Sequence, residues 1–98
     1  MCRRGDIYYA DLGVPGGSRQ SGLRPVLVVS NDTANAHAPV ITVVPLTSKR
    51  KAMHMPTHVL LPRQTATGLK RTSIALVEQV TTIDKAQLQN QTGRVLDE

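Results

Sequence analysis

The sequence predicts a mainly β fold, either a small antiparallel barrel or a sandwich, and three observations support this class. The chain has 98 residues, enough for one domain with one modest core. Short β-branched and apolar runs recur between glycine, proline and polar residues. No segment carries the long amphipathic pattern of an extended helix, and no internal repeat is visible. We therefore expect one domain that spans residues 1–98.

The first three predicted strands are marked by their boundaries. Residues 6–12 form the first strand, and the glycine-rich loop at 13–22 ends it. A continuous apolar run at 25–30 suits a strand that is buried on both faces. Residues 40–46 form the third strand, and Pro45 predicts an edge position or a bulge near its end.

Two short helical segments and three further strands complete the prediction. Residues 31–36 offer cap residues followed by alanines, which favours one helical turn. A second short helix is expected at 82–88, capped by Thr82 or Asp84. The remaining strands are expected at 57–61, 72–80 and 93–96.

Charge and composition limit the classes of partner. The formal net charge is +5 and the isoelectric point is near 10.0, which favours polyanions such as nucleic acid, or an acidic protein segment. A surface charged only for solubility would look the same. Aromatic residues make up 2% of the chain, Tyr8 and Tyr9, which argues against binding by base stacking on an aromatic platform.

Several chemistries lack the residues that they need. The single cysteine, Cys2, excludes an internal disulfide and a thiolate-rich zinc site. No P-loop and no serine–histidine–aspartate order is recognisable, and we expect neither a metal nor a cofactor. No signal peptide and no membrane-spanning run are visible, so the expected location is the cytoplasm.

Histidines offer one route to RNA cleavage, because two imidazoles near one phosphate can act as acid and base. The chain has His37, His54 and His58. His54 and His58 flank a proline, in a loop and at a strand start, which is a poor arrangement for a fixed pair. Paired-histidine catalysis is therefore the weaker hypothesis.

Arg24 is the strongest candidate for gripping an anion. It lies where the Gly/Ser-rich loop at 16–22 meets the apolar run, and Pro25 restricts its backbone to extended geometry. The fork of donors on a guanidinium matches phosphate oxygens. The alternative is a solvated arginine at a strand start.

Glu78 and Gln79 end the predicted strand at 72–80. A buried carboxylate is costly unless it is paired, and Arg24 would be the natural partner if the two strands lie side by side. Basic side chains elsewhere could line a track for an RNA backbone, or form a solvated cluster. They are Lys49, Arg50, Lys51, Arg63, Lys70 and Arg71.

Taken in order, these segments resemble the MazF/PemK family of toxin endoribonucleases over nearly the whole chain. Each matching piece is weak alone, and their common order and spacing carry the resemblance. The pieces are Arg4-Gly5-Asp6-Ile7-Tyr8, Asp11-Leu12, Gly17-Ser18, Arg24-Pro25-Val26, Ser30-Asn31-Asp32, Pro45-Leu46-Thr47-Ser48, Pro56-Thr57-His58-Val59, Gly68-Leu69, Glu78-Gln79-Val80 and Thr82-Ile83-Asp84-Lys85.

The resemblance implies a compact SH3-like antiparallel barrel that forms a homodimer. It implies a toxin of a toxin-antitoxin system that cleaves single-stranded RNA, such as mRNA, at a short sequence without a metal ion. Attack by the ribose 2′-hydroxyl would leave a 2′,3′-cyclic phosphate and a 5′-hydroxyl. The expected protein partner is an antitoxin with an acidic, partly disordered tail.

The resemblance also assigns roles to residues. The catalytic pair of the family corresponds to Arg24 and Thr47. RNA contacts are expected at or beside the remaining matched positions, which are Ser18, Arg19, Gln20, Ser48, Lys49, Glu78 and Gln79. Many members carry Glu at the position of Arg19, which bears on base specificity. Members usually end in an amphipathic helix, and we expect that helix to be missing here, because the sequence stops at its start.

Two other hypotheses stay open at this point. A module of the same fold could act without catalysis, by binding a protein or a nucleic acid, and Arg19 and the missing helix would favour it. A generic basic scaffold is the other. A ribonuclease assay without metal discriminates the first, and an Arg24→Ala variant with an unchanged cellular effect would favour the second.

Overall fold

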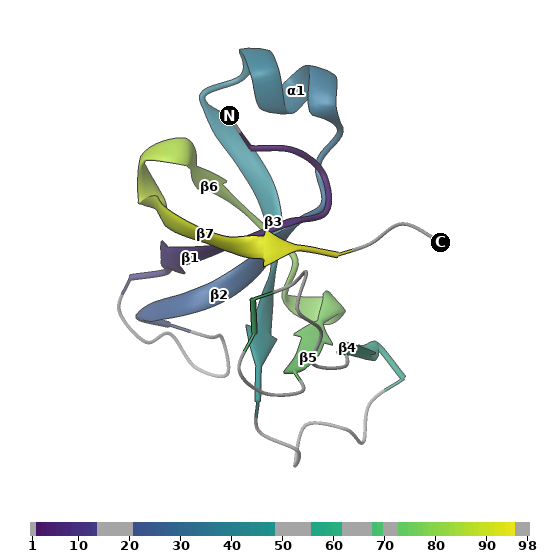
Figure 1. Ribbon diagram of the computed structural model, residues 1–98. Coiled ribbons are helices and arrows are strands. Elements are labelled where there is room, and N and C mark those ends of the chain that lie inside the picture. Colours follow the sequence, from purple (N-terminus) through teal and green to yellow (C-terminus); the bar gives the residue numbers. More distant parts are fainter. Residues whose placement is uncertain (1, 14–20, 49–55, 62–67, 70–72, 96–98) are drawn as a thin grey trace.

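The computed structural model describes residues 2–13, 21–48, 56–61, 68–69 and 73–95 (Figure 1). In this part of the chain, seven antiparallel strands are joined by one α-helix and two 3-10 helices, which confirms the mainly β class. In chain order the elements are β1 (Asp6–Asp11), β2 (Leu23–Val28), α1 (Asp32–His37), β3 (Val40–Thr47), β4 (His58–Leu61), β5 (Ser73–Leu76), η3 (Val77–Gln79), β6 (Thr81–Asp84), η4 (Lys85–Gln87) and β7 (Leu88–Arg94).

β3 is the central strand of the sheet. The strand order is β4-β5-β3-β2-β1-β7, and β6 pairs with β3 off this path. Along one edge β3 pairs with β2. Along the other edge its partner changes from β6, at the pair Val43↔Thr81, to β5, at the pair Leu46↔Ala75.

Pro45 lies at this change of partner, between the two ladders. A proline cannot donate a ladder hydrogen bond, so it is tolerated where the described pairs leave an interruption. Of the two alternatives predicted for Pro45, the sheet edge is wrong, because β3 is paired on both sides, and the bulge stays a prediction.

Two hydrophobic clusters pack on the opposite faces of β3. Ile41 and Val43 belong to the first cluster, and Val44 and Leu46 belong to the second. Successive side chains of a strand point to opposite faces, so β3 contributes to both cores. Burial on both faces was predicted for the run at 25–30, but it is found in β3, and Leu27 of β2 is only partly buried.

The helical turn predicted at 31–36 is confirmed as α1. The side chain of Asn31 accepts a hydrogen bond from the N–H of Ala34 at 2.8 Å and caps the helix. Asn35 is buried and donates from Nδ2 to the carbonyl oxygen of Ser30 at 2.9 Å, so α1 is tied to the end of β2. No helix in the described part of the chain combines the length and apolarity needed to cross a membrane.

The predictions for the C-terminal half need two corrections. The strand predicted at 72–80 stops after β5, and η3 follows it. The helix predicted at 82–88 is reduced to the single turn of η4, because the β-branched residues before it pair with β3 as β6. The last strand, β7, begins well before the predicted segment at 93–96.

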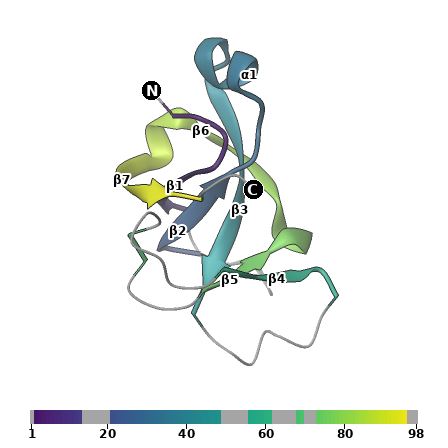
Figure 2. The same cartoon turned by 45° about the vertical axis from the view of Figure 1, so that its right-hand side comes forward.

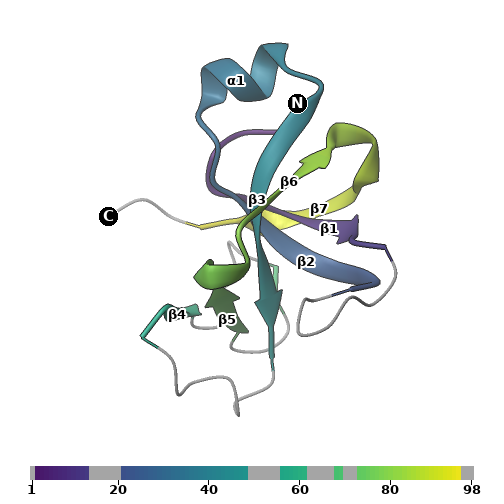
Figure 3. The same cartoon turned by 180° about the vertical axis from the view of Figure 1, so that it is seen from behind.

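The elements divide between the two ends of the molecule. α1 lies at one end, and β4, β5 and η3 lie together at the other end (Figures 1 and 2). β1, β2 and β7 cross the middle, and the same division is seen from behind (Figure 3). The candidate catalytic and RNA-binding residues that the structure describes belong to β2, to the end of β3 and to η3.

Candidate functional site

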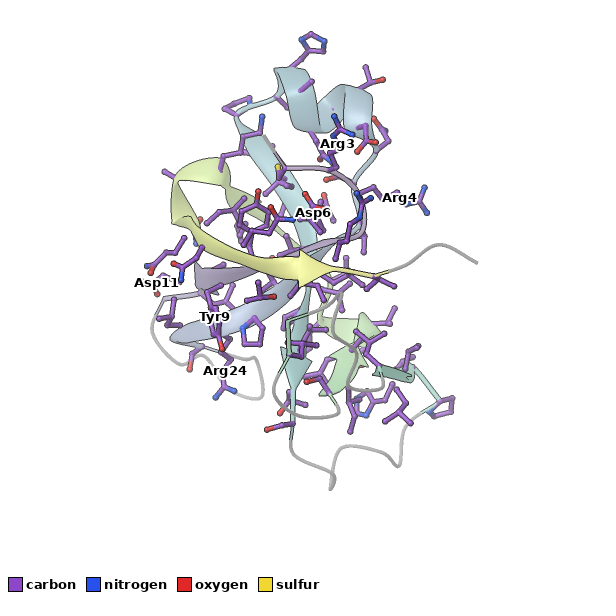
Figure 4. The ribbon with its side chains drawn as sticks, in the orientation of Figure 1. Arg3, Arg4, Asp6, Tyr9, Asp11 and Arg24 are labelled. Carbon is purple, nitrogen blue, oxygen red and sulfur yellow. The ribbon has the colours of Figure 1, made fainter. Side chains whose placement is uncertain are left out.

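Arg24 lies near the start of β2, opposite Ala10 of β1. The side chain is partly buried, and Nε donates a hydrogen bond to the carbonyl oxygen of Ser21 at 2.8 Å. The other four N–H donors of a guanidinium sit on its two terminal nitrogens, which are the groups suited to an anion. Figure 4 shows the guanidinium extending outward from β2, on the side away from Arg3 and Arg4.

Thr47 is the last residue of β3 and is 5% exposed. It pairs with Ile74 of β5, so its backbone position is held by the sheet. Ser48 follows directly and is exposed. The chain therefore passes from a rigid strand to the surface within one peptide unit of Thr47.

The register of β2 and β3 relates Arg24 to Thr47. The described pairs run from Val28↔Val43 to Val26↔Pro45. Two further residues in the same register would set Arg24 opposite Thr47. Residues two apart on a strand share a face, so Arg24 follows the face of Val26, and Thr47 follows the face of Val43. Beyond the last described pair the two ribbons diverge (Figures 1 and 3).

Glu78 and Gln79 lie in η3 rather than at the end of a strand, and Glu78 is exposed. The expected pairing of Glu78 with Arg24 is wrong. Its carboxylate instead accepts a hydrogen bond from Thr57 Oγ1 at 2.9 Å, and its other oxygen lies 2.9 Å from His58 Nε2. The reason is that η3 turns towards β4, whereas Arg24 lies across β3 on β2.

The surroundings of Glu78 favour its ionised form. Partial burial raises the pKa of the carboxyl group, but the hydrogen bonds from His58, the backbone and Thr57 and the attraction of His58 outweigh it. The net result is a pKa below the ordinary value of 4.5. Glu78 is therefore a carboxylate acceptor at neutral pH.

The sequence predicts no role for Thr57 beyond its place in the family resemblance, and His58 enters otherwise only as a member of the weaker paired-histidine hypothesis. The signal that could have found them is the motif Pro56-Thr57-His58, in which two hydrogen-bonding side chains follow a proline at a strand start. Their partner, Glu78, becomes visible only when β4 and η3 are folded together. His37 ends α1, at the end of the molecule opposite β4, so it is remote from His58 (Figures 1 and 3).

Several predicted site residues fall outside the described residues. They are Ser18, Arg19, Gln20, Lys49, Arg50, Lys51, His54, Arg63, Lys70 and Arg71. Among the residues that are described, no three His, Cys, Asp or Glu side chains gather into a group that could hold a metal ion.

An apolar groove of about 330 Å³ lies against the second hydrophobic cluster. One wall is formed by Val77 and Val80, on and next to η3, and another by Val59 and Leu61 of β4. The floor is made by residues of β2, β3 and β5. Val77 of η3, which lines this groove, is the residue next to Glu78 in the chain.

Comparison with known proteins gives consistent similarities over the whole chain. Residues 3–98 match the family described as PemK-like, MazF-like toxins of type II toxin-antitoxin systems. The chain is 41% identical to the endoribonuclease EndoA of Bacillus subtilis (strain 168) over 98 residues, which are 100% of this chain and 84% of that protein.

Solved structures are similar as well. An endoribonuclease from a mycobacterial species, in complex with its cognate antitoxin, is 29% identical with a TM-score of 0.78, over 98% of this chain and 81% of that one. MazF from Deinococcus radiodurans is 22% identical with a TM-score of 0.80, over 97% and 82% of the two chains, and supports the fold alone.

Proposed function

This chain belongs to the PemK-like, MazF-like toxins of type II toxin-antitoxin systems, and from this premise we propose that it cleaves single-stranded RNA at a short sequence without a metal ion. It is an endoribonuclease, as its relatives are named. Arg24 and Thr47 are the proposed catalytic residues.

The register of β2 and β3 is the observation that supports this pair most directly. The described pairs end at Val26↔Pro45, beyond which the strands diverge, and Arg24 and Thr47 each lie two residues past that pair, on the same face of their own strand as the paired residue. The hydrogen bond from Arg24 Nε to Ser21 would orient the guanidinium, so that its terminal nitrogens are left for a phosphate. Burial of Thr47 would hold its hydroxyl in one position.

The protein does not need to supply a nucleophile, because the RNA provides one in its ribose 2′-hydroxyl. The 2′-oxygen attacks the adjacent phosphorus, the bond from phosphorus to the 5′-oxygen breaks, and a 2′,3′-cyclic phosphate forms. One proton leaves the 2′-oxygen and one reaches the 5′-oxygen, so the step consumes no water. The protein must align the 2′-oxygen with the phosphorus and stabilise the charge on the phosphoryl oxygens.

Arg24 is proposed to stabilise that charge and not to act as a base. A guanidinium stays protonated at neutral pH, so it is a poor proton acceptor and a good double donor. The Thr47 hydroxyl would donate to the same phosphate. Loss of one such donor typically raises a barrier by about 3–4 kcal/mol.

Contacts to the rest of the RNA are proposed for the other residues that the family resemblance assigns. They are Ser18, Arg19, Gln20, Ser48, Lys49, Glu78 and Gln79. Arg19 replaces a family glutamate, so a base contact there would use a donor in place of an acceptor. The formal net charge of +5 supports contact with a phosphate backbone.

Two protein partners are proposed. One is a cognate antitoxin with an acidic tail, because a similar mycobacterial endoribonuclease was solved in complex with its cognate antitoxin and this chain is basic. The other is a second copy of this chain, and the apolar groove beside η3 offers described surface for an interface. Light scattering of the purified chain, alone and with its antitoxin, tests both. The proposed location is the cytoplasm.

End mapping on a long single-stranded RNA in excess EDTA tests the activity. We expect cuts at one recurring short sequence, with 2′,3′-cyclic phosphate and 5′-hydroxyl ends. A substrate with a 2′-deoxy residue on the 5′ side of the scissile phosphate should stay intact. Ends that carry a 5′-phosphate, or cleavage of an all-DNA strand, would contradict the mechanism. Intact RNA with tight binding would favour a non-catalytic toxin instead.

A further inference from the structure

We infer that Thr57 and His58 are positioning residues, which act with Glu78 to hold η3 so that Gln79 is presented to the RNA. The inference rests on the proposed function, since it assigns a role to residues outside the proposed catalytic pair. The three side chains of Thr57, His58 and Glu78 are called the clamp below.

The clamp joins two segments that are far apart in the sequence. The N–H of Val77 donates to the carbonyl oxygen of Thr57 at 3.3 Å. Thr57 Oγ1 donates to Glu78 Oε1 at 2.9 Å, and His58 Nε2 lies 2.9 Å from Glu78 Oε2. One backbone bond and two side-chain bonds thus fasten the start of β4 to η3, and both carboxylate oxygens are engaged.

η3 is a short element that gains from hydrogen bonds outside itself. It is a single 3-10 turn, whose hydrogen-bond geometry is intrinsically poorer than that of an α-helix. Within the turn the N–H of Val80 donates to the carbonyl oxygen of Val77 at 3.1 Å. Val77 is 41% exposed and Val80 is 49% exposed, so apolar burial contributes little. Charge-assisted hydrogen bonds from outside are the natural way to fix such a turn.

The negative charge of Glu78 is unfavourable beside a proposed RNA surface unless other groups of the protein compensate it. Unpaired, Glu78 would repel phosphates. In the clamp its charge is met by donors from Thr57 and His58, and the next residue along η3 is Gln79, whose side chain carries two amide donors and a carbonyl acceptor. Apart from Glu78 itself, His58 is the only titratable side chain on β3, β4, β5 and η3, the elements that surround the clamp.

Binding to an uncleavable RNA tests the clamp apart from catalysis. The probe is the mapped cleavage sequence with a 2′-deoxy residue at the scissile ribose. We expect His58→Ala to weaken its binding about tenfold, the usual effect of losing one hydrogen bond to a charged group. His58→Gln keeps a donor at a similar reach and should recover most of the affinity. His37→Ala, at the exposed end of α1, is the matched control and should bind as the wild type does.

A double-mutant cycle separates positioning from general stability. If the clamp acts through Gln79, His58→Ala should lower the affinity for the uncleavable RNA by less than about twofold in a chain that already carries Gln79→Ala. An equal tenfold loss in both backgrounds, or no loss in the wild-type background, would overturn the inference. Thr57→Val against Thr57→Ser repeats the comparison at the second contact of the clamp.

Hydrogen exchange at the Val80 amide gives a result that does not depend on RNA. His58→Ala should speed exchange there, because that amide closes the η3 turn, and should leave the amides of β1 and β2 unchanged. Unchanged exchange at Val80 would overturn the clamp even if RNA cleavage is established. A wild-type chain that neither binds nor cuts RNA would instead overturn the proposed function, whatever the exchange rates are.

Discussion

Arg24 is oriented by the backbone oxygen of Ser21, which accepts a hydrogen bond from its Nε at 2.8 Å. A long side chain normally loses conformational entropy when it binds an anion. Here part of that entropy is lost on folding, so the proposed contact of the terminal nitrogens with a phosphate would cost less conformational entropy. The relationship makes Arg24 the first residue to test.

Arg24→Ala should lower the cleavage rate by about 10²–10³-fold with little change in the melting temperature, because the side chain is partly exposed and proposed to act on the transition state. Arg24→Lys keeps the charge but loses the fork, and should recover only part of the rate. Single-turnover rates on the mapped RNA sequence measure both. Arg4→Ala, which removes an equal charge on the other side of the molecule, is the control (Figure 4). Near-normal turnover by a folded Arg24→Ala protein would remove Arg24 from the site.

Thr47 can be tested with almost no change of shape. Thr47→Val deletes the hydroxyl and keeps a β-branched side chain at a buried position, so we expect a folded protein with a cleavage rate lowered by about 10²-fold. Thr47→Ser keeps the hydroxyl and should stay within about tenfold of the wild type. Rates are compared at equal folded fraction, measured by circular dichroism. If Thr47→Val cleaves RNA as fast as the wild type, the Thr47 hydroxyl takes no part in catalysis.

Features of the site that depend on adjacent residues could be predicted from the sequence, whereas the hydrogen-bond partners of its side chains could not. Arg24 was singled out from its own neighbours in the chain, whereas Thr47 was assigned only by the family resemblance and is found as the last residue of β3, one residue beyond the strand predicted at 40–46. Glu78 was assigned to Arg24 because a carboxylate needs a donor, and the choice of donor depends on which strands become neighbours. β5 and η3 lie next to β4, so Thr57 and His58 fill that role.

The strand predicted at 72–80 and the sheet edge predicted at Pro45 are wrong for related reasons. Val77 and Val80 have the β-branched side chains of a strand, so the run at 72–80 looked continuous. The chain leaves β5 after Leu76 because the hydrogen bond from Val77 to Thr57 turns it away from the sheet. Pro45 was read as an edge marker for the same kind of reason, since nothing local to it announces the change of partner from β6 to β5.

Gly68 offers a test of the fold that does not involve RNA. It has a φ of +68°, and a Cβ added there would lie 2.0 Å from the carbonyl oxygen of Thr92 on β7. Gly22 has a similar φ of +72° with nothing within 4 Å of an added Cβ. Both alanine variants carry the strain of a left-handed residue, about 1–2 kcal/mol, and only Gly68→Ala adds a backbone clash.

We therefore expect Gly68→Ala to be the more destabilising variant by several kcal/mol, and to express poorly or unfold at low denaturant. Gly22→Ala should unfold cooperatively with a modest loss of free energy. Urea titrations at one pH measure the difference. Equal stabilities would mean that the backbone at Gly68 and Thr92 can separate at no cost.

Acid should weaken the fold partly through Glu78. The pKa of its carboxyl group is lower in the folded chain than its ordinary value of 4.5. A carboxylate of this kind stabilises the folded state above its unfolded pKa, and that contribution disappears as the pH falls through the folded pKa. The free energy of unfolding of the wild type should therefore exceed that of Glu78→Gln at pH 7, and the two should converge below pH 4. Asp11→Asn, a carboxylate that lies away from the clamp, is the control for the change in net charge. A difference in the free energy of unfolding between wild type and Glu78→Gln that stays constant from pH 7 to pH 3 would contradict this prediction. It would show that the charge of the carboxylate does not contribute to holding η3.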